Sequence, residues 1–319
     1  MKGQLIFIGS FLFTLCLIFD GCKETTETTG NNAEKFYGNV KSVKQTKYVA
    51  NDKFGELTKQ KIEPKDDVSD RSEIIHILDF YEYQFVDGKI VESKSFYLDG
   101  NIRYEHKYDR NDNIILSVVY DKNGFLTDST TRKYDTKNNL RESSHYSGTG
   151  KLMGKDIVKY ISGREVERKV YKYQGELENI IRTKYENRGR RVIEYNYRVY
   201  DGVTFKSVSE FDSKGNEIEH HTFRSDTVTL SSSDYCKYNK SGKLVEYKSD
   251  RIGDEYVSQH EYNNRGLVIN DKTCFGPNDK NPSVQKYEYK FDENGNWIEK
   301  IEYKNNIPKY IYERIIKYY

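Results

Sequence analysis

The stretch Tyr120-Asp-Lys-Asn-Gly-Phe-Leu126 decides the fold of this chain. An aromatic residue opens it, a polar turn with Asn and Gly follows, and an apolar residue stands six positions after the aromatic. The phrase returns along the chain, most clearly at residues 108–114, 134–140, 238–244 and 291–297. Because a fixed internal period sets the architecture before any single residue does, we interpret the chain as a repeat protein.

The period of the repeat matches a β-hairpin. A step near 12 residues divides into a turn of about four and a strand of about eight. Gly and Asn tolerate the positive φ that such turns require, and the recurring Asp caps its own turn through a side-chain oxygen. The sequence therefore predicts an all-β fold, a long antiparallel meander of 12-residue hairpin repeats that forms a single twisted or coiled, solenoid-like sheet. The anchors of the regular stretch are Tyr97, Tyr108, Tyr120, Tyr134, Tyr146, Tyr160, Tyr173 and Tyr185.

The spacing of six residues predicts a small packing clamp over each turn. Side chains alternate along a strand, so Tyr134 should pack with Leu140, and Phe291 with Trp297. The same alternation puts Tyr104 and His106 on one face and Glu105 on the other. A residue that recurs at every turn serves the scaffold, so Trp297, in the Leu position, is interpreted as a packing residue and not as a sugar-stacking platform.

The first residues read as a targeting segment. Lys2 precedes an apolar stretch at residues 5–19, and Cys22 follows directly. Phe19-Asp-Gly-Cys22 resembles the bacterial lipobox, although Asp20 departs from the small or apolar residue usual there; the resemblance implies lipidation of Cys22. An ordinary cleaved signal peptide is the alternative. We expect a lipoprotein signal peptide at residues 1–21, a flexible tether at 22–36 and one repeat domain at 37–319.

Two further cysteines belong to the mature body. Cys236 and Cys274 would both lie in an oxidising compartment, where disulfides form. They stand about three repeats apart, so they can meet only if their strands are close neighbours. The sequence leaves a disulfide and two buried free thiols equally open.

The Tyr-Asp-x-x-Gly-x-Leu phrase resembles the YD repeats of Rhs and teneurin-type proteins over most of residues 81–304. That resemblance implies strand after strand of one coiling antiparallel sheet. We find neither the core segment nor the C-terminal toxin of the large Rhs proteins in this sequence, so we expect the fold and not the toxin function to carry over. It is more similar to small YD-repeat lipoproteins of the Bacteroidota type, which open with a phrase like Gly38-Asn-Val-Lys-Ser-Val43 and carry Asp-x-x-Gly-Asn-Trp near the end.

The residues favour no catalytic, metal or cofactor chemistry. Lys and Arg total 52 against 50 Asp and Glu, and this balance argues against a nucleic-acid partner. Glu219-His-His221 is the most metal-like cluster, but adjacent strand residues point to opposite faces, so one ion cannot take both His220 and His221 without a bulge. We expect no enzyme, no metal and no cofactor, since no nucleophile elbow, phosphate loop or dinucleotide motif is present.

One basic stretch is the densest charge cluster, and an acidic glycan or lipopolysaccharide would contact it if it had a function. An exposed sheet face with its turn explains it equally well and is preferred. Its residues are Arg182, Lys184, Arg188, Arg190 and Arg191.

The sequence thus predicts a lipid-anchored repeat protein of the cell envelope, at the bacterial outer membrane, on its periplasmic side or on the cell surface. It would act as a binding or scaffolding module for an envelope protein or a glycan. A surface glycan hydrolase and an Rhs-associated accessory or immunity protein are the alternatives. Function should lie where the repeat is interrupted, at residues 52–72, 195–211, 223–235 and 275–283.

Overall fold

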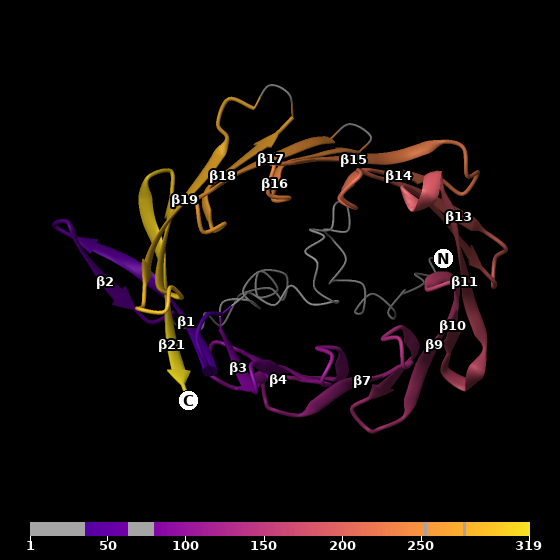
Figure 1. Ribbon diagram of the computed structural model, residues 1–319, viewed down its shortest axis with the longest axis horizontal. Helices are drawn as coiled ribbons and strands as arrows, with labels where there is room; N and C mark the ends of the chain where they lie inside the picture. The colour runs from indigo at the N-terminus through magenta and orange to yellow at the C-terminus, as the bar shows by residue number, and fades with distance from the viewer. Residues whose placement is uncertain (1–35, 63–79, 252–253, 277–278) are drawn as a thin grey trace, which may run out of the picture.

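The computed structural model describes residues 36–62, 80–251, 254–276 and 279–319, and in them the chain is almost entirely β-strand (Figure 1). Two 3-10 turns, η1 (Tyr173–Gly175) and η2 (Asn187–Gly189), are the only helical segments of that part, and no helix in it is long and apolar enough to cross a membrane. The strands are β1 (Val40–Lys53), β2 (Glu56–Gln60), β3 (Tyr81–Val86), β4 (Lys89–Phe96), β5 (Ile102–Tyr108), β6 (Ile114–Tyr120), β7 (Leu126–Tyr134), β8 (Leu140–Ser147), β9 (Leu152–Ile161), β10 (Arg164–Lys172), β11 (Leu177–Glu186), β12 (Arg191–Arg198), β13 (Thr204–Phe211), β14 (Glu217–Phe223), β15 (Leu230–Tyr238), β16 (Leu244–Arg251), β17 (Asp254–Tyr262), β18 (Val268–Phe275), β19 (Ser283–Phe291), β20 (Trp297–Lys304) and β21 (Ile307–Tyr318).

The all-β antiparallel meander of hairpins is confirmed, but the expected open, solenoid-like sheet is wrong. From β3 to β21 each strand pairs with the next one, and β1 pairs with both β3 and β21. The sheet therefore closes into a barrel of 20 strands (Figure 1), while β2 pairs with the end of β1 outside the ring. β1 closes the ring with its two edges: Ser42–Gln45 pair with β3 on one side and, within a longer stretch, with β21 on the other.

The turns form as their sequences predict. In the turn after β7, Oδ1 of Asp135 accepts the backbone N–H of Lys137 and of Asn139, both at 2.9 Å. Asn138 occupies the left-handed position with φ 69°, where the turn after β6 has Gly124 at φ 81°. Tyr134 pairs directly with Leu140, with a bulge beside it, as Phe291 does with Trp297. The repeat phrase is thus a bulged hairpin, which also increases the local twist of the sheet.

The anchor tyrosines add a connection that spacing alone does not show. The hydroxyl of Tyr134 donates to the carbonyl of Ile114, at the start of the preceding strand. Tyr238 bonds Glu217, and Tyr262 bonds Leu244, in the same way. Each ring therefore lies across its neighbouring strand and its hydroxyl replaces water with a backbone acceptor, which fixes the strands laterally.

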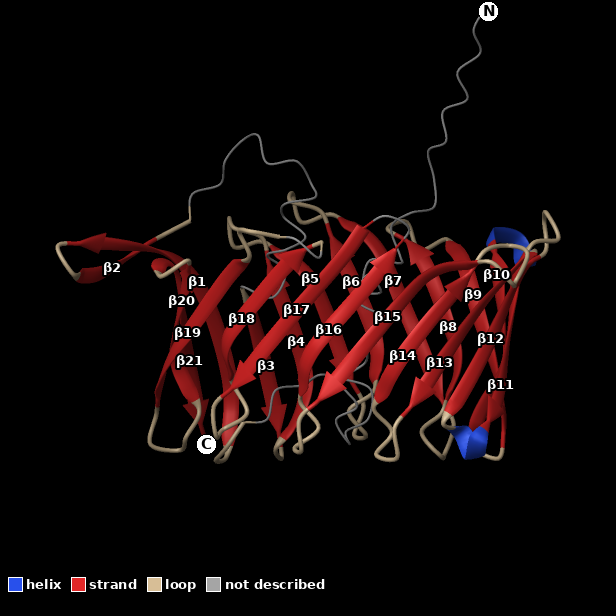
Figure 2. Ribbon diagram, turned by 90° about the horizontal axis from the view of Figure 1, so that it is seen from above, coloured by secondary structure: helices blue, strands red, loops and turns tan. Residues whose placement is uncertain are grey.

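Backbone geometry decides which face of the sheet lines the lumen. The backbone N–H of Phe211 donates to the carbonyl of Arg190 and therefore points toward β12. Backbone groups of a strand repeat their direction every two residues, so the N–H and C=O of Ser209 in β13 also point toward β12. Figure 2 shows the C-terminus at the lower rim; odd-numbered strands from β3 on therefore run downward, and β12 lies to the right of β13. For an L-residue in this arrangement the side chain points away from the viewer. Ser209 therefore faces the lumen.

The register carries this assignment around the barrel and separates two different chemistries. The inner wall has small polar side chains, histidines and tyrosines: Ser93, His106, Ser117, Thr130, His145, Ser209, His220, Asp234, Ser249, Ser258, His260, Asp271 and Tyr287. The outer wall carries aliphatic side chains such as Ile193, Val208 and Ile301. Among them stand many cations and carboxylates: Lys94, Glu105, Lys107, Lys133, Glu142, Lys155, Glu167, Arg182, Lys237, Glu246, Lys248, Lys290, Glu299 and Glu313. The expected split between His106 and Glu105 is confirmed.

Closure can be tested with a cross-link over the seam between β1 and β21. Thr46 lies opposite Glu313 on the outer wall. With the free thiol of Cys274 replaced by Ser, the pair Thr46→Cys and Glu313→Cys should oxidise to a disulfide and migrate faster on a denaturing gel, because cross-linked chains are more compact. Thr46→Cys with Ile301→Cys, which lies one strand further away, is the control that should stay open. If the Thr46–Glu313 cysteine pair formed no more disulfide than the control pair, the sheet would not be closed.

Candidate functional site

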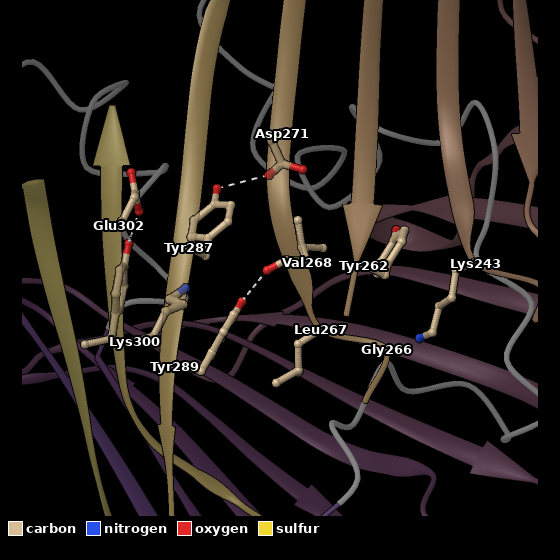
Figure 3. Close-up of a pocket in the computed structure, with 11 residues that line it drawn as sticks. Lys243, Tyr262, Gly266, Leu267, Val268, Asp271, Tyr287, Tyr289, Lys300 and Glu302 are labelled. Carbon is tan, nitrogen blue, oxygen red and sulfur yellow. Dashed lines mark hydrogen bonds between the residues drawn. The ribbon is translucent and has the colours of Figure 1, made fainter. Parts of the chain in front are cut away.

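A cavity of about 460 Å³ opens on the inner wall over β17 to β21, and tyrosines dominate its lining (Figure 3). The alternation of each strand points Tyr287 and Tyr289 into the lumen side by side, with Asp271 and Lys300 from the flanking strands. The lining residues are Lys243, Tyr262, Gly266, Leu267, Val268, Asp271, Tyr287, Tyr289, Lys300, Glu302 and Tyr312. Aromatic faces with a few convergent charges are typical of a ligand-binding site.

Asp271 is the centre of a hydrogen-bond network beside this cavity. Its Oδ1 lies 2.6 Å from Nδ1 of His260, and its Oδ2 accepts the hydroxyl of Tyr287 at 3.0 Å. Tyr287 also donates toward Oε1 of Gln285 at 3.1 Å. Burial raises the pKa of the Tyr287 phenol well above its ordinary value, and the negative charge of Asp271 raises it further. The phenol therefore stays protonated and serves as a donor.

The network extends to a serine in the order of a hydrolytic triad. Oγ of Ser258 lies 3.3 Å from Nε2 of His260, whose Nδ1 faces Asp271. Ser258 is only 6% exposed and does not line the cavity, so an electrophile bound there would not reach its oxygen. Elsewhere on the inner wall Ser209 bonds His220 and Thr130 bonds His145 across neighbouring strands, where no carboxylate completes a triad-like order in these bonds. These contacts stabilise the wall rather than activate a nucleophile.

The other side of the cavity is built on stacked cations. Nζ of Lys300 lies 3.8 Å from the ring centroid of Tyr312, whose hydroxyl donates to Glu302 at 2.9 Å. Next to them the guanidinium of Arg314 covers the buried ring of Trp297 at 3.3 Å. Trp297 therefore packs, as its repeat position predicts, and its face is taken by Arg314.

The predicted basic stretch does not form a free cationic surface. Arg182 pairs with Glu167, Lys184 with Glu186, and Arg191 with Glu210. Arg188 and Arg190 lie in and beside η2, at the lower rim. Arg182, Lys184 and Arg191 are thus paired with neighbouring carboxylates of the outer wall, in keeping with the preferred interpretation of an exposed sheet face.

The structure forms no disulfide between Cys236 and Cys274, which was one of the two alternatives that the sequence left open. Cys236 lies opposite Tyr247 on the inner wall, whereas Cys274 lies opposite Val257 on the outer wall and is a free thiol. Side chains on opposite faces of one sheet cannot bond, so the strand separation of the two cysteines was not the deciding quantity. Cys22, the predicted lipidation site, lies outside the described residues.

The histidine pair behaves as alternation predicts. His220 faces the lumen and His221 the outside, where its Nδ1 lies 2.9 Å from Oγ of Ser233. In the described part of the chain no group of three His, Cys, Asp or Glu side chains is placed to hold a metal ion.

The predicted role as a lipid-anchored binding or scaffolding module also requires correction. It assumed a long open sheet that offers a face to an envelope protein or glycan, and the closed barrel has no such open sheet. The alternatives, a surface glycan hydrolase and an Rhs-associated accessory or immunity protein, did not depend on an open sheet and stay hypotheses. The cavity over β17 to β21, which the sequence did not indicate, is enclosed by the ring.

Comparisons with known proteins return no matching family model and no matching curated protein. Among solved structures, the chain is similar to a porin-like protein from Bacteroides uniformis, with 10% identity, a TM-score of 0.31, and coverage of 88% of this chain and 98% of the other. A porin-like protein from Bacteroides vulgatus has 10% identity and a TM-score of 0.27, over 66% of this chain and 96% of its own. At such TM-scores the likeness carries no conclusion about function.

Proposed function

We propose that this protein is a hydrophilic hollow barrel at the bacterial outer membrane, whose polar lumen holds a water-soluble guest. The charged outer wall is the observation that carries the proposal. The wall is laced with ion pairs: Glu142 lies 3.0 Å from Lys133 and 2.8 Å from Lys155, and Glu299 lies 2.7 Å from Lys290. These pairs are half-exposed and typical of a surface in water.

The same wall is unsuited to lipid. A membrane-spanning barrel presents an apolar band about 25 Å tall, and one Lys or Arg at its midplane costs roughly 2–4 kcal/mol. Here Lys107, Arg182 and Lys248 are outward-facing strand residues on well-separated strands, so the cost would recur around the ring. Polar residues on both faces favour a barrel with water inside and outside.

A second candidate is a water-filled channel through the outer membrane. The observation in its favour is closure with an even number of antiparallel strands, which bacterial outer-membrane barrels share. The two candidates differ in what surrounds the outer wall: the channel requires it to lie in the hydrocarbon of the membrane, and the hydrophilic barrel requires it to stay in water.

The decisive experiment uses a chain that begins at Lys23, which keeps every described strand. Mixed with vesicles and with planar bilayers, it should give no stepwise conductance, and carbonate at high pH should strip any bound protein, because no strand lies in the hydrocarbon. Conductance steps or carbonate-resistant protein would replace the proposal with the channel. The anchor predicted at Cys22 would supply membrane attachment of the natural protein and is tested by fractionating cells that express Cys22→Ser.

A further inference from the structure

One rim of the barrel exposes apolar side chains at the tips of its hairpins. Alternate hairpins of a meander turn at the same end, so the turns that follow the even-numbered strands lie at the upper rim of Figure 2, and the β1–β2 hairpin projects sideways from the barrel near that rim. The most exposed large apolar side chains gather there, one in each of several hairpins spread around the ring. The five most exposed are Phe54, Phe125, Tyr200, Val228 and Phe275; together with the less exposed Tyr173 they are called the apolar rim below.

Their exposure is high for residues of this kind. Phe54 is fully exposed, and Tyr200, Phe125 and Val228 are 65%, 69% and 78% exposed. Cations accompany the rings: Nζ of Lys151 lies 3.7 Å from the ring centroid of Tyr173, and Arg198 lies 5.2 Å from that of Tyr200. Large apolar side chains gathered at one edge of a protein in water mark a contact surface.

The opposite rim shows that these residues are not demanded by the turns. Its turns use the same five-residue pattern as the turn that carries Phe125, and the last position there is Asn113, Asn139, Asn216, Asn296, Lys243 or the half-buried Leu267. At the upper rim itself Asn101 takes that position in the turn after β4. Asn139 and Asn216 donate to the Asp that caps their turn. Phe125 makes its backbone bond to Asp121 but directs an exposed ring into solvent. The hairpin closes with either residue, so the phenyl ring serves something outside the barrel.

Backbone strain supports the same conclusion for Phe54. It has φ 58°, in the left-handed region that favours Gly, Asn and Asp and costs a bulky residue about 1 kcal/mol or more. A side chain that is fully exposed gains no burial to offset that strain.

We infer that the apolar rim is a docking surface for the interfacial layer of a lipid bilayer. The tips belong to separate hairpins around one end of a ring, so they can meet a flat partner together, whereas a globular partner would meet only one sector of it. Tyrosine, phenylalanine and aliphatic side chains beside Lys and Arg are the residues that settle at the boundary of headgroups and acyl chains. The barrel then stands on the membrane and its lumen opens toward the lipid surface, while the charged wall stays in water.

The test measures co-sedimentation of the chain from Lys23 with vesicles of phosphatidylethanolamine and phosphatidylglycerol. The triple variant Phe54→Ser, Phe125→Ser, Tyr200→Ser should bind at least about tenfold more weakly, since three interfacial contacts are lost. The control triple variant, Val86→Ser, Ile161→Ser, Tyr319→Ser, changes exposed apolar residues at or near the lower rim and should bind like the parent. Circular dichroism and thermal unfolding verify that both variants fold.

Three outcomes would overturn the inference: no binding by the parent chain, equal weakening in both triple variants, or a rim-dependent dimer in place of vesicle binding. The inference rests on the proposed hydrophilic barrel, but the two fail differently. Vesicle binding that carbonate reverses supports both, and its absence removes only the docking surface. Binding with conductance steps removes the hydrophilic barrel.

Discussion

Replacing Arg314 with Met is expected to lower the free energy of unfolding by about 3 kcal/mol, a large effect for one side chain. Arg314 is 6% exposed in β21, and its Nε donates to Oε1 of Gln45 in β1 at 3.0 Å. Its terminal nitrogen donates to the hydroxyl of Tyr81 in β3, and its guanidinium covers the ring of Trp297 in β20. One side chain thus joins four strands at the seam, and Met would leave buried polar partners without a donor.

The measurement is denaturant unfolding followed by fluorescence of Trp297, the chain's single Trp. Arg182→Met on the outer wall is the matched control, because Arg182 is two-thirds exposed and its pair with Glu167 is worth less than about 1 kcal/mol. A loss at Arg314 no greater than that at Arg182 would show that the seam does not depend on this contact.

Acidification from about pH 7 to about pH 4.5 should destabilise the barrel through His106 by roughly 2–3 kcal/mol. Burial, and then the positive charge of Arg132, lower the pKa of His106 from 6.5 to about 4. The folded state therefore binds a proton less readily than the unfolded state. The stability from neutral His106 is complete above pH 6.5 and is lost as the pH falls from there to about 4.

His106→Gln should remove that part of the pH dependence, which urea unfolding at the two pH values measures as a difference from the parent. The variant His221→Gln, on the outer wall, provides the control for loss of an imidazole. The assignment is refuted if His106→Gln is destabilised by acid as strongly as the parent protein.

The local parts of the fold could be predicted from sequence because each depends on neighbours in the chain. The cap of Asp135, the left-handed Asn138 and the pairing of Tyr134 with Leu140 lie within one turn. The division of β5 into two faces follows from a period of two residues. The contacts that cause these features lie within one repeat, so the sequence of a single repeat is enough to predict them.

Closure could not be predicted in the same way. It depends on the tilt and accumulated stagger of all strands, which bulges alter slightly at each hairpin. Likewise, the pairing of Cys236 and Cys274 was judged by sequence distance when the face of the sheet decided it. The interrupted segments at 52–72, 195–211, 223–235 and 275–283 contain Phe54, Tyr200, Val228 and Phe275 of the apolar rim. Interruptions of the repeat marked the unusual hairpins but not their shared position on one rim.

The seam has a consequence for how the protein is made. Gln45 in β1 and Arg314 in β21 are 269 residues apart in sequence, yet their side chains form a hydrogen bond across the seam. Each hairpin can fold as it leaves the ribosome or the translocation machinery, but β1 has no partner for its β21 edge until the last strand arrives. Contacts of such separation form slowly, and an unpaired strand edge invites pairing with other chains. During most of its synthesis the nascent protein is therefore an open sheet in which the β21-pairing edge of β1 has no partner. A chaperone that covers this edge should raise the yield of closed barrel.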